Sequence, residues 1–298
     1  MLISVIVCTY NRSAYLYRCL SLLAQNDYHG SWELMVINNN STDDTAQVCE
    51  RFATAYPNVN YHYHLETEQG LSHARNRGLR EAHGDWYVFL DDDAYVAHDY
   101  LTNLEKHLHN ADFDAFGGKI TPLFEPHAPL WYSRWSMGFV SALDMGNEKH
   151  YFPHGKFPIG ANMGLSRNAV KRVGMFNTTL GRNKNNLLAG EEKDIIYRIV
   201  DNGMTVAYLP DIEVQHVIPE HRTTDQFIAR LGYGVGQSER LRTQANGAVA
   251  YCIRLCSEAV KWGATITIAA YYTITAQYQK GRILLLFRKN VTQGLLAK

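Results

Sequence analysis

The apolar positions in the first part of the chain follow two different periods. Short runs of β-branched and aromatic residues predict buried strands, and stretches with an apolar residue every three or four positions predict amphipathic helices. Elements that alternate in this way predict an α/β fold with a mostly parallel central sheet and helices on both faces. The expected strands are 2–8, 32–37, 61–64 and 86–90, and the expected helices begin at Ser13, after Asp44 and at Leu71.

Polar side chains gather where three of these strands end, in residues 9–12, 38–44 and 91–93. Open α/β sheets bind their ligands at the carboxyl ends of the strands, so we expect a site there. The turn after the first strand has no Gly-x-Gly-x-x-Gly pattern, and the sequence contains no Gly-x-x-x-x-Gly-Lys-Ser/Thr loop. These absences argue against a dinucleotide dehydrogenase and a P-loop enzyme.

The acidic run Asp91–Asp93 directly follows an apolar strand. Three adjacent carboxylates repel one another, and a hard dication such as Mg²⁺ or Mn²⁺ removes that cost. Because alternate residues of a strand point the same way, Asp91 and Asp93 can face one ligand while Asp92 faces elsewhere. The run by itself fits an acidic helix-capping turn equally well, since aspartate is common in such turns.

The segment 121–157 is irregular and rich in aromatic residues and proline. Long excursions of this kind are often functional. Trp131 and Trp135 could stack on an acceptor sugar or lipid, and packing that merely closes the loop is an equal alternative.

Helical patterning dominates from Thr224 onwards, so we expect a first domain at 1–222 and a helical extension at 223–298. The extension is basic, with 11 Lys/Arg against 3 Asp/Glu after His221, whereas the preceding part has 18 against 26. Segment 262–279 carries no charge, but its threonines and glutamines make it too polar for a membrane span. A helix at the membrane interface and a helical pair packed on the catalytic domain are the two expectations.

Five widely spaced cysteines, an odd number, favour reduced thiols. The first residues lack the basic flank and cleavage site of a signal peptide. We therefore expect a cytoplasmic protein, with peripheral contact to the cytoplasmic face of a membrane as a further expectation and no nucleic-acid partner.

Several segments together, in their order along the chain, closely resemble the family 2 glycosyltransferases of GT-A fold. Single Asp-x-Asp runs are weak signals, whereas the ordered set is specific, and the resemblance covers residues 2 to 222. The segments are 4–12, 39–45, 70–79, 89–93, 160–167, 190–198 and 214–216.

The resemblance implies a nucleotide-diphosphate sugar as donor. The loop after the first strand and Asn39 would hold the base, and the Asn39 carbonyl can accept the N3 proton of uracil. Many relatives carry aspartate at this position; uridine is therefore favoured, with guanine or thymine as alternatives. Arg75 resembles an arginine that approaches the base or the diphosphate, with a helix-surface ion pair as the alternative. The residues expected on the donor are Cys8, Thr9, Tyr10, Asn11, Asn39, Arg75, Asp91 and Asp92.

The same resemblance implies that Asp93 is the principal metal ligand, with Asp91 as a supporting ligand and His216 as a third. Single histidines are, however, more often structural. Asp92 is expected nearer the donor ribose. We expect His216 to lie in a loop facing the diphosphate, together with His221 and Arg222, after a strand and turn at 206–210.

Glu191 and Glu192 precede an apolar helical stripe, so both are expected at a helix N-terminus, where the helix dipole stabilises carboxylates. An acceptor hydroxyl must lose a proton as it attacks. By position, Glu192 matches the family's base in inverting enzymes, with Glu191 and Asp194 as rivals. Ordinary acids of a helix N-terminus are the alternative. On the acceptor side the resemblance adds Asn162 and Met163 to Trp131 and Trp135.

The expected function is a metal-dependent inverting transfer of a sugar, by one in-line displacement, to a hydroxyl of a glycan or lipid-linked acceptor. A retaining sugar transferase is one alternative. A sugar-1-phosphate nucleotidyltransferase is less consistent, because residues 8–12 are not a Gly-rich basic loop. A non-catalytic sugar- or lipid-binding module of the same fold would turn over no donor.

Overall fold

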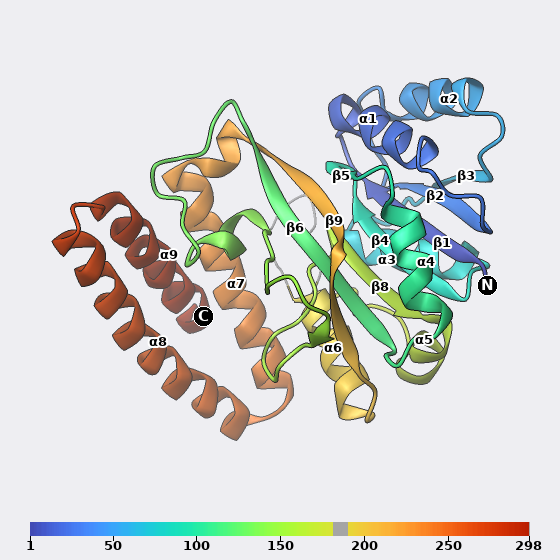
Figure 1. Ribbon diagram of the computed structural model, residues 1–298. Helices are drawn as coiled ribbons and strands as arrows, with labels where there is room; N and C mark the ends of the chain where they lie inside the picture. Colours follow the sequence, from blue (N-terminus) through green and yellow to red (C-terminus); the bar gives the residue numbers. More distant parts are fainter. Residues whose placement is uncertain (181–189, 298) are drawn as a thin grey trace. The chain divides into compact units, whose positions relative to one another are not determined.

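The computed structural model of the protein describes residues 1–180 and 190–297. Its strands form one sheet in the order β3-β2-β1-β4-β8-β6-β9-β5, with β7 paired to β9 (Figure 1). The strands are β1 Ile3–Thr9, β2 Trp32–Asn38, β3 Tyr61–Leu65, β4 Trp86–Asp91, β5 Ala94–Val96, β6 Ala115–Glu125, β7 His150–Tyr151, β8 Asn162–Ser166 and β9 Val206–Pro219. The helices are α1 Ser13–Ala24, α2 Thr45–Ala55, α3 Leu71–Glu81, α4 Tyr100–His109, α5 Arg167–Val173, α6 Glu191–Asp201, α7 Asp225–Ala245, α8 Ala248–Ile274 and α9 Tyr278–Leu296, with 3₁₀ turns at Met137–Val140 and Glu220–Thr223.

The α/β class and the parallel arrangement of the first four strands are confirmed. Strand β1 pairs in parallel with β2 and β4, and β2 with β3. Beyond β4 the sheet becomes antiparallel, since β8 pairs antiparallel with β4 and β6, and β9 does so with β5 and β7. The sheet is therefore mixed. Its parallel half brings the carboxyl ends of β1, β2 and β4 to one edge.

Apolar side chains cover both faces of the sheet, as expected. On one face, Val5 and Val7 of β1 pack in a core cluster with Leu16 and Leu20 of α1. On the other face, Ile6 belongs to a cluster that includes buried residues of α3 and α6. Each fully buried aliphatic side chain contributes about 1.5–3 kcal/mol. The alternation along β1 thus fixes which helices lie on which face.

The chain forms two compact units. The first comprises Met1–Pro122, Ala142–Thr178 and Glu191–Val217, and the second is built chiefly from Leu123–Ser141 and Ile218–Lys298. The second unit includes residues 123–141 of the aromatic excursion, whereas residues 142–157 of it belong to the first unit. The domain boundary expected after residue 222 stays a prediction.

The helical character expected after Thr224 is confirmed. Thr224 caps α7, because its hydroxyl accepts a hydrogen bond from the backbone N of Phe227 at 3.3 Å. Helices α7 and α9 approach closely at glycines, and a Cβ on Gly236 would overlap the carbonyl oxygen of Val291. Among the residues that the structure describes, no helix is both long and apolar enough to span a membrane.

Candidate active site

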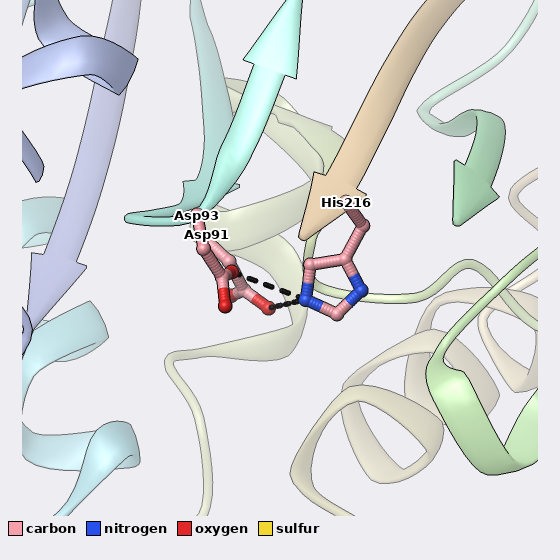
Figure 2. A group of neighbouring side chains, drawn as sticks. All are labelled: Asp91, Asp93 and His216. Carbon is pink, nitrogen blue, oxygen red and sulfur yellow. Dashed lines mark ion pairs between the residues drawn. The ribbon is translucent and has the colours of Figure 1, made fainter. Parts of the chain in front are cut away.

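The acidic run lies at the carboxyl end of β4, as expected. Asp91 ends the strand, and Ala94 begins β5 after a tight turn. The thiol of buried Cys19 lies 3.6 Å from the carbonyl oxygen of Asp91 and 3.4 Å from that of Ala94, so α1 helps to hold the turn. Asp91 and Asp93 point to the same side, as expected, although Asp93 lies in the turn beyond the strand (Figure 2).

His216 reaches this turn because β5 pairs antiparallel with β9. Ala94 lies opposite His216, and the backbone N of Val217 donates to the carbonyl oxygen of Asp93 at 2.9 Å. His216 Nε2 is 3.1 Å from Asp93 Oδ1 and 4.0 Å from Asp91 Oδ2 (Figure 2). The expected turn at 206–210 and loop around His216 are wrong, because β9 continues through Pro219. The strand places the imidazole more rigidly than a loop would.

The three side chains form a set that fits a divalent cation. One ligand atom from each of Asp91, Asp93 and His216 lies within 4.8 Å of the others. The side chains of Asp93 and His216 are 3% and 1% exposed, whereas that of Asp91 is 35% exposed. Two carboxylates and an imidazole suit Mn²⁺, and the exposed side of Asp91 leaves room for oxygen ligands from a substrate.

Arg12 also belongs to this site, although the sequence did not single it out. Its Nη2 forms an ion pair with Asp93 Oδ2, and its Nε lies 3.5 Å from Asp92 Oδ1. Its guanidinium therefore offsets part of the crowded negative charge. The sequence feature that could have indicated Arg12 is its position at the end of the polar segment 9–12. This segment follows β1, and β1 lies beside β4 in the sheet.

Asn39 organises the loops at the edge of the sheet. Its side-chain Nδ2 donates to the carbonyls of Glu66 and Glu68 at 3.2 and 2.7 Å, and its Oδ1 accepts from the backbone N of Gly70 at 2.8 Å. Its backbone N donates to the carbonyl of Thr9 at 2.9 Å. Asn39 thus holds segment 66–70 beside the loop that follows β1. The hydrogen bonds to Glu66 and Glu68 occupy both hydrogens of its side-chain amide.

The loop after β1 contains the other residues expected on the donor. Asn11 Oδ1 accepts a hydrogen bond from the backbone N of Thr42 at 2.7 Å, which joins the loops after β1 and β2. Thr9 is buried, and among the described residues its hydroxyl has no hydrogen-bond partner. Burial raises the pKa of the Cys8 thiol to about 12, so that thiol stays neutral. Tyr10 is half-buried beside them.

Arg75 is buried and bridges the two glutamates of α6, so an ordinary helix-surface pair is excluded. Its Nη1 lies 2.9 Å from Glu191 Oε1, and its Nη2 lies 3.0 Å from Glu192 Oε1. Burial lowers the pKa of the Arg75 guanidinium, but Glu192, Glu191 and Asp91 raise it by more, so the net shift is upward. Arg75 therefore stays charged, and it lies within electrostatic reach of the two glutamates and of Asp91.

The two glutamates begin α6, which confirms their expected place at a helix N-terminus. Glu192 Oε1 also accepts a hydrogen bond from the backbone N of Gly160 at 3.1 Å. A Cβ on Gly160 would overlap both Arg75 Nη2 and Glu192 Oε1, so any larger residue at this junction must displace these side chains. The side chain of Glu192 is 18% exposed and that of Glu191 only 3%, which gives Glu192 the better access to a substrate.

The residues expected on the acceptor side are divided between the two units. Asn162 and Met163 lie buried in β8, and Asn162 accepts from Tyr100 Oη at 2.7 Å while donating to the carbonyl of Ile212 at 2.6 Å. Trp131 and Trp135 belong to the second unit. Trp131 is buried and donates to the carbonyl of Thr223 at 3.0 Å, whereas Trp135 is exposed. Their contacts with an acceptor stay a prediction.

Comparison with known proteins assigns the chain to a protein family. The model of the family "Glycosyl transferase family 2" matches residues 4–174. The chain is 26% identical over 246 residues to glucosyl-dolichyl phosphate glucuronosyltransferase of Haloferax volcanii, with 81% of this chain and 77% of the relative covered. It is 28% identical over 236 residues to the succinoglycan biosynthesis protein ExoM of Rhizobium meliloti, with 78% and 72% covered.

A solved structure supports the same fold. Mannosyltransferase PcManGT from Pyrobaculum calidifontis, in complex with GDP-Man and Mn²⁺, superposes with a TM-score of 0.65 over 99% of this chain and 87% of that chain, at 19% identity. The family match covers the acidic run and the polar loops of β1, β2 and β4. The chain therefore belongs to glycosyl transferase family 2 and is a glycosyltransferase of GT-A fold.

Proposed function

We propose that the protein transfers a sugar, with inversion at the anomeric carbon, from a nucleotide-diphosphate donor to a hydroxyl of a glycan or lipid-linked acceptor. The observation that carries this proposal is the meeting of Asp91, Asp93 and His216 at the carboxyl edge of the sheet. Ligands of open α/β sheets bind at that edge, and the loops after β1 and β2 flank it.

Asp91, Asp93 and His216 would hold the metal, for which Mn²⁺ is our first candidate and Mg²⁺ our second. When bound, the metal supplies positive charge that stabilises the leaving diphosphate. Arg12, already paired with Asp92 and Asp93, offers a second cationic group for the same oxygens. Mn²⁺ comes first because PcManGT was solved with it.

Glu192 is our proposed general base. Its carboxylate is the more exposed of the pair, and hydrogen bonds from Arg75 and Gly160 hold one of its oxygens in place. Such anchoring orients the group towards an acceptor hydroxyl. Glu191 is buried against Arg75, and Asp194 Oδ2 pairs with Arg198 Nη2 at 3.0 Å, so both rivals are less suited.

Uridine is the base we propose, on the family resemblance, and guanosine is the second candidate because PcManGT binds GDP-Man. Asn39 would act mainly by shaping the base site, since Gly70 already donates to its Oδ1. The Thr9 hydroxyl, which has no hydrogen-bond partner among the residues that the structure describes, is the group we expect to contact the nucleotide. A lipid-linked acceptor is favoured because the Haloferax relative is named for a dolichyl phosphate substrate.

A donor screen tests the proposal. Nucleotide sugars are incubated with Mn²⁺, and nucleotide release is compared between wild type, Asp93→Ala and Glu192→Gln. Asp27→Ala, a change of an exposed aspartate, is the matched control. We expect one donor to be consumed, with both site variants at least 100-fold slower and the control unchanged. Turnover unaffected by either site variant would refute the site, whereas no turnover with any donor and acceptor would support the binding-module alternative. The anomeric configuration of the product distinguishes inversion from retention.

A further inference from the structure

Helix α8 has its charged side inside and its apolar side outside. It runs for 27 residues from Ala248 to Ile274, a length of about 40 Å. Its buried positions include Arg254, Glu258 and Thr265. In contrast, Val249 is 74% exposed, Val260 is 74% exposed and Ile274 is 85% exposed. A helix that faces water normally shows the opposite distribution.

Five exposed residues of α8, four aliphatic and one cysteine, lie on one side of the helix. At 3.6 residues per turn, Val249, Ile253, Cys256, Val260 and Ile274 fall within a narrow sector on one side of the helix. The three charged residues of α8 lie outside this sector. This side of the helix is therefore uncharged along its length, with the exposed Gly263 and Thr267 between Val260 and Ile274. We call these five residues the outer stripe of α8.

The polar inner side explains why the outer stripe is left uncovered within this unit. Arg254 Nε lies 2.9 Å from Glu239 Oε2, and its Nη1 lies 2.9 Å from Glu258 Oε2. Arg288 and Thr292 of α9 reach the other oxygen of Glu258, both at 3.2 Å. These ion pairs and hydrogen bonds hold α8 against α7 and α9, beside which it runs in Figure 1. The helix packs through this polar cluster along its first half and through Ala269 and Tyr272 near its C-terminal end, and none of the five exposed residues takes part.

The charge around the helices is cationic. The three carboxylates after His221 are Asp225, Glu239 and Glu258, and each forms an ion pair with an arginine. Lys261 and Lys289 are exposed. The exposed surface of α8 and α9 therefore offers positive charge.

We propose that α8 lies on an anionic lipid bilayer, with its outer stripe in the interfacial region and the lysines against lipid phosphates. Uncharged apolar area together with flanking cations is what such a surface recognises. The exposed Tyr271 and Tyr278, near the C-terminal end of α8, suit the headgroup level. A second copy of the chain fits less well, because pairing the stripes would bring two cationic surfaces together.

This interaction extends the proposed function without depending on its chemistry. A transferase whose acceptor is lipid-linked must work at a bilayer, and α8 would bring the enzyme there. Vesicle binding needs no donor, metal or acceptor. A failure of the membrane proposal is therefore distinguishable from a failure of the proposed transfer reaction.

Vesicle sedimentation tests the proposal on the full chain. Wild type, the double variant Val260→Asp/Ile274→Asp and the matched control Met175→Asp, which changes an exposed apolar residue outside α8, are each mixed with phosphatidylglycerol or phosphatidylcholine vesicles. We expect wild type and control to sediment with phosphatidylglycerol, and the double variant to bind at least tenfold more weakly. Lys261→Gln should weaken binding about fivefold, the share expected for one lysine near an anionic surface. Thermal melts check that every variant is folded.

Cys256 provides a second readout, since it lies on the outer stripe. Cys256 is exposed, whereas Cys19 and Cys49 are buried and the Cys8 thiol has its pKa raised to about 12. In a Cys252→Ser background, a polarity-sensitive fluorophore therefore couples selectively to Cys256. Its emission should shift to the blue when phosphatidylglycerol vesicles are added.

Two results would overturn the proposal. In the first, the protein fails to sediment with phosphatidylglycerol, or the folded double variant sediments as well as wild type. In the second, light scattering finds a dimer that Val260→Asp/Ile274→Asp dissociates while vesicles leave the emission unchanged. The second result would assign the outer stripe to a second copy of the chain.

Discussion

Gly160→Ala is a small change that tests how the proposed base is held. The added methyl group would overlap Arg75 Nη2 and Glu192 Oε1, which form the ion pair at this junction. Arg75 cannot easily retreat, because it is buried, paired with Glu191 and lies 5.4 Å from the ring centroid of Phe176. Because the overlap with Arg75 Nη2 is the closer of the two, moving Glu192 alone would not relieve it, so we expect the Glu192 carboxylate and the guanidinium that anchors it to be displaced together.

The size of the effect follows from the displacement. Atoms in ordinary contact with a carbon lie about 3.5 Å away, so Glu192 Oε1 must shift by roughly 1 Å. A misplacement of that size can lower a catalysed rate about 100-fold. The hydrogen bond from Gly160 N to Glu192 Oε1 would also be lost, at a cost of about 1–3 kcal/mol in the free energy of unfolding. The donor loops are untouched.

The assay is steady-state donor turnover with Mn²⁺, accompanied by urea unfolding. We expect kcat to fall about 100-fold, with little change in the donor KM. Gly263→Ala is the matched control, because a Cβ there meets open space, and it should keep full turnover. An unchanged kcat for folded Gly160→Ala would refute the assignment of Glu192 as an anchored base. A rise in the donor KM alone would instead place the junction in donor binding.

Three further substitutions probe the metal ligands, the loops and the distal end of the sheet. His216→Ala should weaken Mn²⁺ binding tenfold or more, measured by titration calorimetry; equal affinity would exclude His216 as a ligand. Asn39→Asp should lower stability by about 2 kcal/mol, because a carboxylate would face the carbonyls of Glu66 and Glu68; an unchanged urea midpoint would contradict this role. Burial raises the pKa of Glu33, but hydrogen bonds from Ser4 and His83 outweigh it, so the net shift is downward. A pKa that is lowered in the folded state stabilises the fold above the unfolded-state pKa, so Glu33→Gln should destabilise near neutral pH. This effect should shrink as the pH falls below about 4 and vanish only below the lowered pKa of the folded state. A pH-independent loss in urea unfolding would show that this carboxylate is not ionised.

Local patterns were sufficient for the first half of the fold. The apolar runs around β1, β2 and β4 mark buried strands, and their polar ends had to meet at one edge once the strands were parallel. The place of Asp91 and Asp93 was therefore predictable. The short strand β8 was not, because five residues of β8 give too little periodicity to distinguish a strand from a turn.

Long-range pairings were beyond the sequence pattern. The place of His216 depends on the register of β5 with β9, and no local feature of the chain specifies that register. Arg75 shows the same limit, since the α3 pattern cannot reveal that its guanidinium meets Glu191 and Glu192. Asn39 was expected to read the base, but its amide is engaged by backbone carbonyls that only the folded loop brings near.

Asp91, Asp93 and His216 are the residues that we propose to hold a metal for the donor diphosphate. This role is tested by calorimetric titration of UDP and GDP into the protein with and without Mn²⁺, for wild type and Asp93→Asn. We predict that one nucleotide binds wild type only with Mn²⁺ and that Asp93→Asn abolishes this binding. Nucleotide binding of equal strength without metal, or in Asp93→Asn with Mn²⁺, would contradict the account.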